Sequence, residues 1–182
     1  MSDKLDVLVV SDIHGRVDKL NKLIEYRQKL LKKGEVLNLI FLGDGLDDLF
    51  SCARYDSIIV HAVRGNCDHS VPFGPFGEDI PTEMTLELCG HKIFIAHGHT
   101  LDVKFTKARL YQRAAEVGAD ITLFGHTHMP LEEYITNERM PSLAKPIAVF
   151  NPGSLGFGST FGNLSLSKDA FLLSHGNLDN IK

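Results

Sequence analysis

Seven side chains of the types that bind divalent metal ions fall in five short motifs of this sequence. The motifs read Asp-Ile-His, Gly-Asp, Gly-Asn, His-Gly-His and Gly-His-Thr-His, and their candidate ligands are Asp12, His14, Asp44, Asn66, His97, His126 and His128. Carboxylate and amide oxygens mixed with imidazoles suit Mn²⁺, Fe²⁺, Zn²⁺ or Ni²⁺. Seven ligands without a thiolate are too many for one tetrahedral zinc ion. We therefore predict a site for two metal ions.

A central carboxylate such as Asp44 has two oxygens and could bridge two ions about 3.5 to 4 Å apart, the spacing of two-metal hydrolytic sites. Asp12 and His14 would complete one side, and Asn66 and His97 the other. Two divalent ions contribute four positive charges and the two carboxylates remove two, so the site would be cationic and would attract a phosphoryl group. The ions would also lower the pKa of a bridging water from about 15.7 toward neutrality and so generate a hydroxide nucleophile. The predicted chemistry is phosphoester hydrolysis.

Each motif comes directly after a segment that we predict to be a β-strand, because the segment is short, apolar and rich in β-branched residues. Ligand sites in α/β sheets lie at the carboxyl ends of the strands. We therefore expect the five motifs to converge at one edge of the fold. The predicted strands that end at them are Leu5–Val10, Val36–Leu42, Ser57–Val63, Lys92–Ala96 and Asp120–Phe124.

The remaining segments predict a chain that opens as α/β and ends mostly as β structure. Leucines and isoleucines between the first two strands recur at helical spacing, with Gly34 as the residue that follows the helix. A second helix is predicted over Val103–Val117, ended by Gly118. The other predicted strands are Glu83–Leu88, which forms a hairpin with Lys92–Ala96, then Ile147–Phe150 and two short runs between Leu164 and Leu173.

Composition limits the classes of protein to which the chain can belong. Its 182 residues, 43% hydrophobic and 23% charged, predict one globular domain over residues 1–182. No apolar stretch approaches the roughly 18 residues of a membrane span. A net charge of -4, without a track of basic and aromatic residues, disfavours nucleic acid as a partner. Three cysteines without a CxxC motif, and an N-terminus too acidic for a secretory signal, predict a cytoplasmic protein.

Taken in order, the five motifs resemble the five sequence blocks of the calcineurin-like metallophosphoesterases. Gly65-Asn66-Cys67-Asp68 and Asn151-Pro152-Gly153-Ser154 are most similar to the small bacterial and archaeal YfcE-type phosphodiesterases, and the resemblance spans Asp12 to Ser154. It implies a single-domain α/β fold in which two mixed β-sheets lie face to face and are flanked by helices, a four-layer sandwich.

The resemblance also implies the chemistry and its rivals. The implied function is a phosphodiesterase in which a hydroxide bound to two metal ions attacks a small-molecule phosphodiester, in a homodimer or homotetramer. The implied ions are manganese, with nickel, iron or zinc as alternatives. A phosphomonoesterase or nucleotidase could use the same site, and a subunit of the retromer complex has this fold but serves as a binding platform. The implied ligands are Asp12, His14, Asp44 and His128 for one metal, and Asp44, Asn66, His97 and His126 for the other.

The sequence departs from the superfamily at Cys67, where the usual pattern has a histidine that stabilises the phosphoryl group or protonates the leaving oxygen. A thiol is mostly protonated at neutral pH but is a weak hydrogen-bond donor. We therefore expect good leaving groups to be handled far better than alkoxides, unless His99 or His69 supplies the proton. The candidate catalytic residues are Asn66, Cys67, Asp68 and His99.

A few other features have competing interpretations. Asp47 and Asp48 are expected to be carboxylates at a helix N-terminus rather than ligands. Arg16 either clamps phosphate or is solvated. Asn151–Ser154 is expected to form a turn near the site, with no chemical role assigned. The Pro/Gly-rich loop Val71–Pro81 either lines the substrate cleft or forms a subunit contact.

Overall fold

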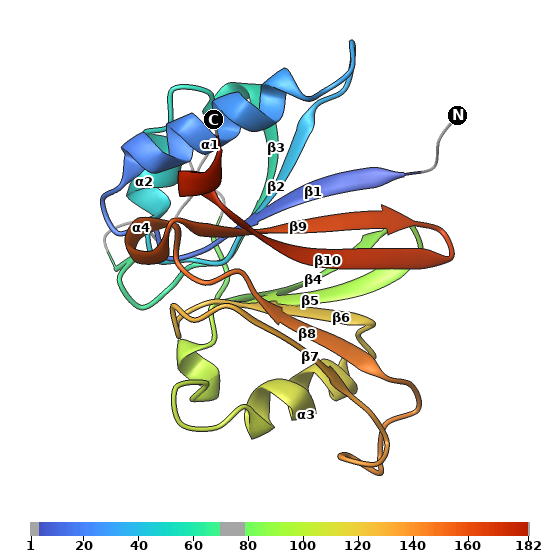
Figure 1. The fold of residues 1–182 in the computed structure, drawn as a ribbon. Coiled ribbons are helices and arrows are strands. Elements are labelled where there is room, and N and C mark those ends of the chain that lie inside the picture. Colours follow the sequence, from blue (N-terminus) through green and yellow to red (C-terminus); the bar gives the residue numbers. More distant parts are fainter. Residues whose placement is uncertain (1–3, 70–78, 182) are drawn as a thin grey trace.

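Two five-stranded sheets lie face to face in a computed structural model of the chain, which describes residues 4–69 and 79–181 (Figure 1). Residues 71–78 of the predicted loop Val71–Pro81 lie outside the described residues. Both sheets contain parallel and antiparallel strands. The predicted fold class, an α/β fold with two mixed sheets flanked by helices, is therefore confirmed.

The first sheet has the strand order β10-β9-β1-β2-β3. Its three N-terminal strands are parallel to one another, and an antiparallel hairpin from the end of the chain extends it on the other side of β1. The strands are β1 (Leu5–Val10), β2 (Leu37–Phe41), β3 (Ile58–Ala62), β9 (Thr160–Ser167) and β10 (Ala170–Asn177).

The second sheet has the strand order β4-β5-β6-β8-β7. Its three central strands are parallel, and the two edge strands pair with them in the antiparallel direction. The strands are β4 (Glu83–Leu88), β5 (His91–Ala96), β6 (Ile121–Phe124), β7 (Leu131–Ile135) and β8 (Ile147–Asn151).

Helices cover the outer faces of the two sheets. In Figure 1, α1 and α2 lie on the first sheet and α3 lies on the second, so the layers are helix, sheet, sheet, helix. The helices are α1 (Val17–Lys29), α2 (Leu46–Phe50), α3 (Ala108–Glu116) and α4 (Leu155–Gly158), with 3-10 turns at Tyr55–Ser57, His99–Leu101 and Leu178–Asn180. None of the helices in the described residues has the length and apolar character needed to span a bilayer.

Apolar side chains that alternate between the two faces of the strands fill three interfaces between these four layers. In β1, Leu8 and Val10 pack with the buried leucines of α1, whereas Val7 and Val9 pack against the second sheet. On the far side of the second sheet, Phe94 of β5 packs against Leu110 of α3. Because successive side chains of a strand point to opposite faces, a strand covered on both sides is apolar throughout. This explains the unbroken apolar runs that the sequence contains.

Two predicted helix boundaries and one strand differ from the sequence predictions. Helix α1 ends at Lys29, and Gly34 lies in a turn further on with φ +90°, so Gly34 is not the residue that follows the helix. Helix α3 begins at Ala108 rather than Val103, because residues 102–106 form a separate turn in which the N–H groups of Phe105 and Thr106 donate to the Asp102 carbonyl. Strand β7 was not predicted; its consecutive glutamates hide the alternation of an edge strand.

Candidate metal centre

All seven predicted ligands lie just beyond the carboxyl ends of parallel strands, as the sequence predicts. Asp12 and His14 follow β1, and Asp44 follows β2 in the same sheet. In the opposite sheet, His97 follows β5 and the His126–His128 segment follows β6. The two sheets meet at this point, since His97 Nδ1 lies 2.7 Å from the carbonyl oxygen of Leu42, next to β2.

The first cluster of ligand atoms consists of Asp12, His14 and His128. Asp12 Oδ1 lies 3.1 Å from His128 Nε2 and 3.6 Å from His14 Nε2, and the two imidazole nitrogens are 3.2 Å apart. The other carboxylate oxygen, Oδ2, accepts hydrogen bonds from the Ser11 hydroxyl at 2.5 Å and the His126 N–H at 3.1 Å. Oδ1 is buried and has no hydrogen-bond partner among the described residues.

The second cluster consists of Asp44, His97 and His126. Asp44 Oδ2 lies 3.4 Å from His97 Nε2, which in turn lies 3.1 Å from His126 Nδ1. Because His97 Nδ1 donates to the Leu42 carbonyl, Nε2 is the ring nitrogen that would bind a metal ion in place of its proton. The same Asp44 Oδ2 lies 3.9 Å from His14 Nε2, so this one oxygen lies between the two clusters.

Asn66 and Cys67 lie beside these clusters on the segment after β3. Asn66 Oδ1 is buried and, like Asp12 Oδ1, lacks a hydrogen-bond partner among the described residues. The Asn66 amide nitrogen donates to Cys67 Sγ at 3.3 Å. The thiol forms a third group of ligand-type atoms with His14 and Asp44. The structure therefore brings Cys67 close to His14 and Asp44.

The ligand atoms have the spacing that a divalent ion requires. Two ligands that each lie 2.0 to 2.2 Å from one ion are about 3.0 to 3.5 Å from each other. The pairs joining Asp12 to His128, His14 to His128, Asp44 to His97, and His97 to His126 measure 3.1, 3.2, 3.4 and 3.1 Å. With the unpartnered oxygens of Asp12 and Asn66, these distances show that the residues present fit divalent cations.

Burial and neighbouring charge set the protonation of the metal-free site. Burial raises the pKa of Asp12. Burial also disfavours charge on Asp44, but hydrogen bonds from His97 and the Cys67 N–H outweigh it, so the pKa of Asp44 is below its usual range. Burial, helped by the charge of His97, lowers the pKa of His126 to about 4. His126 is therefore neutral at pH 7, which is the form of imidazole that binds metal.

Backbone strain is concentrated at the predicted ligands. Residues other than glycine seldom adopt positive φ, and holding one there costs about 1 to 3 kcal/mol. Eight such residues occur in the described part of the chain, and five of them are predicted ligands: Asp12 (φ 55°), His14 (49°), Asp44 (59°), His126 (68°) and His128 (59°). The sharp turns after the strands thus aim these side chains inward.

Asp68, predicted as a catalytic candidate, lies behind the loop that carries Asp44. Its Oδ2 accepts from the N–H groups of Asp44 at 2.8 Å and Gly65 at 2.7 Å. Its Oδ1 accepts from the N–H groups of Gly45 at 2.8 Å and Leu46 at 2.9 Å. Because both oxygens bind backbone amides, Asp68 ties the loop after β3 to the loop that carries Asp44. We therefore assign Asp68 the role of positioning these two loops.

Ser154 and its neighbours fix the loop that carries the first predicted ligand. The Ser154 hydroxyl donates to the Asp12 carbonyl at 2.8 Å and accepts from the Phe157 N–H at 3.0 Å. The Leu155 N–H donates to the Ser11 carbonyl at 3.1 Å. From the sequence alone this segment is only a turn. Its bonds to Ser11 and Asp12 join residues about 140 positions apart, so the Asn-Pro-Gly-Ser motif is the sole sequence signal.

Asn151, at the end of β8, supports the loop that carries His126 and His128. Its side-chain amide donates to the Gly125 carbonyl at 2.9 Å and to Thr127 Oγ1 at 3.1 Å. The Asn151–Ser154 segment therefore holds ligand loops from both sheets.

The remaining predicted residues have simpler surroundings. Asp47 and Asp48 lie in the first turn of α2, as expected, and Asp48 Oδ2 also accepts from the Gly15 N–H at 2.7 Å. Arg16 pairs with Asp18 at the surface, with a 2.9 Å contact. The His99 ring lies 5.3 Å from that of His97, and its Nδ1 is buried without a hydrogen-bond partner among the described residues. Burial and His97 lower the pKa of His99.

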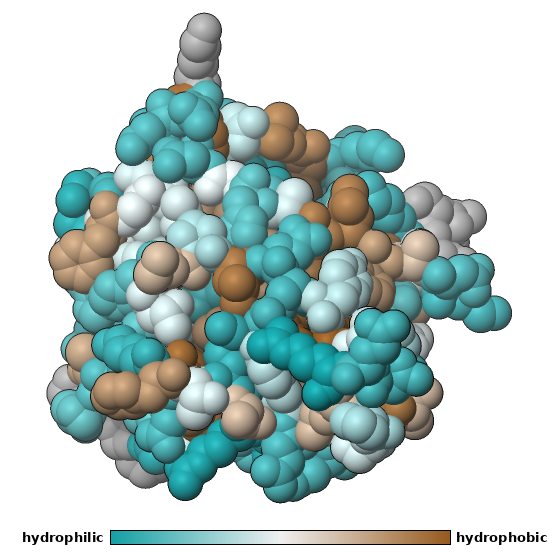
Figure 2. All heavy atoms as spheres, turned by 60° about the horizontal axis from the view of Figure 1, so that its bottom comes forward, coloured by the Kyte–Doolittle hydropathy of each residue, from teal (hydrophilic) through white to brown (hydrophobic). Residues whose placement is uncertain are grey.

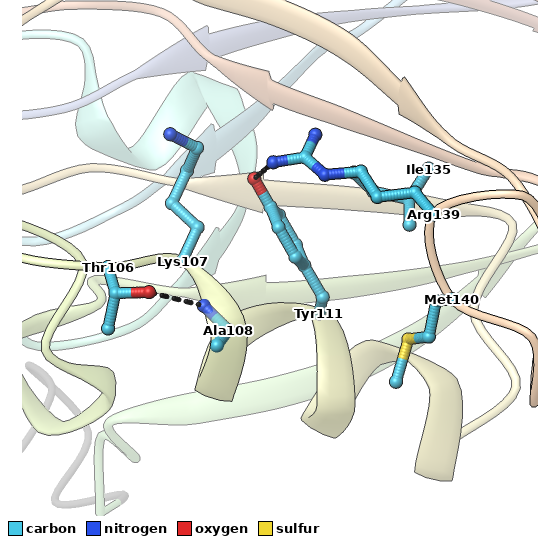
Figure 3. A pocket seen from close by; sticks show the side chains of 7 residues that line it. All are labelled: Thr106, Lys107, Ala108, Tyr111, Ile135, Arg139 and Met140. Atoms are coloured by element: carbon cyan, nitrogen blue, oxygen red, sulfur yellow. Dashed lines mark hydrogen bonds between the residues drawn. The ribbon is translucent and has the colours of Figure 1, made fainter.

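A cavity of about 270 Å³ opens beside both clusters and is lined mainly by carboxylates and glycines, together with His14 and Cys67. Another cavity, of about 460 Å³, lies between α3 and the end of β7 and contains none of the predicted ligands (Figure 3). The face that carries α3 is mostly hydrophilic, with scattered hydrophobic side chains (Figure 2). Of these two cavities, the smaller one is therefore the one lined by predicted ligands.

Comparison with known proteins agrees with this geometry. The family model of the calcineurin-like phosphoesterase superfamily domain matches residues 5–167. The Bacillus subtilis (strain 168) protein named "Probable metallophosphoesterase YsnB" is 31% identical over 152 residues, which cover 83% of this chain and 75% of that one.

Two solved structures share the fold. The Vps29 protein of Cryptosporidium parvum has a TM-score of 0.69 at 16% identity, covering 96% of this chain and 98% of that one. A structure described as a novel archaeal phosphodiesterase has a TM-score of 0.63 at 20% identity, covering 94% of this chain and all of that one. At these identities the likeness is one of fold.

Proposed function

The chain belongs to the calcineurin-like phosphoesterase superfamily, and from this premise we propose that it is a phosphodiesterase that works with two divalent metal ions. We propose Asp12, His14, Asp44 and His128 as the ligands of one ion, and Asp44, Asn66, His97 and His126 as the ligands of the other. Manganese as the native ion and a cytoplasmic location belong to the same proposal.

The observation that carries the proposal is the position of one oxygen. Asp44 Oδ2 lies 3.4 Å from His97 Nε2 in one cluster and 3.9 Å from His14 Nε2 in the other. A carboxylate so placed is suited to bridge two cations. The unpartnered Oδ1 atoms of Asp12 and Asn66 support one further oxygen ligand on each side.

Bound divalent ions would offset the negative charge of the phosphoryl oxygens and lower the pKa of a coordinated water. The chain's own residues prepare the site for this chemistry. Hydrogen bonds to Leu42 and from the Cys67 N–H fix the orientations of His97 and Asp44. Burial keeps His126 in its neutral, ligating form. Cys67 and His99 lie beside the ligands, where they can contact a phosphoryl group.

Metal analysis combined with a substrate panel tests this function. The purified protein, incubated with Mn²⁺ and desalted, is expected to retain about two ions per chain and to hydrolyse bis(p-nitrophenyl) phosphate faster than p-nitrophenyl phosphate. Faster hydrolysis of the monoester would favour a phosphomonoesterase or nucleotidase. Two bound ions with no hydrolysis of any phosphoester would favour a binding platform, and a single bound ion would contradict the dinuclear site.

Because Cys67 stands where a general acid is usual, we expect the rate of hydrolysis to depend strongly on the pKa of the leaving alcohol. In the metal-free site, desolvation and the Asp44 carboxylate raise the pKa of the Cys67 thiol to about 11, and a thiol is a weak hydrogen-bond donor. The wild-type rate is therefore expected to fall steeply as the pKa of the leaving alcohol rises. In Cys67→His the rate for alkoxide leaving groups should rise about tenfold or more, because an imidazolium can act as a general acid.

A series of p-nitrophenyl, phenyl and alkyl diesters measures this dependence. Cys89→His is the matched control, because Cys89 lies in the β4–β5 turn, outside the ligand clusters. A flat dependence in the wild-type protein would show that another group, such as His99 or His69, already supplies the proton.

A further inference from the structure

Phe157 presents an exposed aromatic ring directly beside two predicted ligands. Its ring is stacked on that of His128 with centroids 5.3 Å apart and planes 25° apart, and its centroid is 5.1 Å from that of His14. Nevertheless, 71% of Phe157 is exposed to solvent. Contact with the imidazoles therefore uses only part of the ring surface and leaves the rest open beside the metal centre.

The backbone around Phe157 is held firmly against the loop that carries Asp12. The Phe157 N–H donates to Ser154 Oγ at 3.0 Å, and the Gly156 N–H donates to the Asp12 carbonyl at 3.0 Å. On the other side, Lys19 Nζ donates to the Gly156 carbonyl at 2.7 Å. A ring on a backbone fixed in this way can stack on a ligand without the entropy cost of ordering a loop.

The charges of the adjacent cavity indicate what the rest of the substrate is. The cavity beside His14 is lined by the carboxylates of Asp47 and Asp48 as well as Asp44 and Asp68. Asp47 and Asp48 are not proposed as metal ligands, and their carboxylates would repel a second anionic group of the substrate. A substrate that fits both features has one phosphoryl group for the metals and an uncharged flat ring for Phe157.

We propose that Phe157 determines specificity by stacking on a nucleobase, so that the substrate class is a nucleoside phosphoester with a single phosphoryl group. This inference rests on the proposed function, since the phosphoryl group is taken to bind at the metal centre. Aromatic side chains stack on every base, because each base has a π-face. Because the Phe157 ring contacts the imidazoles of His14 and His128, a base stacked on Phe157 would lie close to the phosphoryl group.

Two ligands that differ only by the base test the proposal by calorimetry on the Mn²⁺-loaded protein. Adenosine 5′-monophosphate is expected to bind about tenfold more tightly than ribose 5-phosphate, the range of one base–aromatic stack. In Phe157→Ala this ratio should fall to about one, mainly through weaker nucleotide binding. Phe157→Tyr should keep the ratio, and Phe157→Leu, which keeps apolar bulk without a ring face, should lose most of it.

Phe105→Ala is the matched control. Phe105 is 92% exposed and, among the described residues, its ring does not contact those of His14 and His128, so the ratio should stay at its wild-type value. Equal losses for both ligands in Phe157→Ala, together with a lower metal content, would mean that Phe157 only supports the imidazoles and would overturn the proposal. Equal affinities in the wild-type protein would overturn it too. If neither ligand binds and no phosphoester is hydrolysed, the proposed function itself fails.

Discussion

Replacing Asp44 by asparagine is expected to lower kcat/KM by about a thousandfold, which corresponds to the several kcal/mol of charge stabilisation that metal ions contribute. Asp44 Oδ1 accepts from the Cys67 N–H at 2.7 Å, and Oδ2 faces His97 and His14. In the variant, the amide oxygen would keep the bond to Cys67. The amide N–H groups would then point at the cations, so the variant should hold fewer than two ions per chain.

Asp102→Asn is the control for this substitution. Asp102 has φ 57°, almost the same as the 59° of Asp44, so both positions impose the same left-handed backbone on asparagine. Asp102 pairs with Arg109 at the surface and belongs to none of the ligand clusters among the described residues. Metal content by mass spectrometry and kcat/KM should be unchanged in this variant. An Asp44→Asn protein that keeps two ions and full activity would contradict the bridging role.

The positions of the candidate ligands could be predicted from the sequence because each follows a strand whose apolar run is easy to recognise. The run before Asp12 is apolar because β1 is covered on both faces, and the same is true of the run before Asp44. Parallel strands of this kind end at a common edge. Residue types at the strand ends therefore indicate where the candidate site lies. The ordered series of five motifs then indicated the superfamily.

The positioning residues could not be predicted in the same way, because their roles depend on which backbone groups lie opposite them. Asp68 has a residue type suited to catalysis, yet its two oxygens bind four backbone N–H groups. Ser154 reaches the carbonyl of Asp12, 142 positions earlier in the chain. Neither contact leaves a periodic pattern. The left-handed turns at the predicted ligands also leave no signal in the sequence, since aspartate, asparagine and histidine tolerate positive φ without requiring it.

Gly156→Ala should test whether this support matters, and the expected effect is a drop in kcat/KM of about a hundredfold. A Cβ atom on Gly156 would lie 2.3 Å from the carbonyl oxygen of Ile13 and 3.0 Å from that of Asp12. Both atoms belong to the backbone of the loop that contains Asp12 and His14. This backbone cannot move aside without displacing the side chains of Asp12 and His14. A displacement of about 1 Å at a catalytic site can cost about a hundredfold in rate. Mn²⁺ affinity should fall as well.

Gly158→Ala separates this effect from a general intolerance of alanine in α4. The nearest atoms to a Cβ on Gly158 belong to Thr160, at 3.5 and 3.7 Å, which is ordinary contact. This variant should match the wild-type protein in Mn²⁺ affinity and in kcat/KM. Overpacking at Gly156 is expected to lower the free energy of unfolding by about 1 to 3 kcal/mol, so denaturant unfolding of both variants must accompany the kinetics. A Gly156→Ala protein that is less stable but binds Mn²⁺ and turns over normally would mean that α4 supports the fold and not the ligand loop.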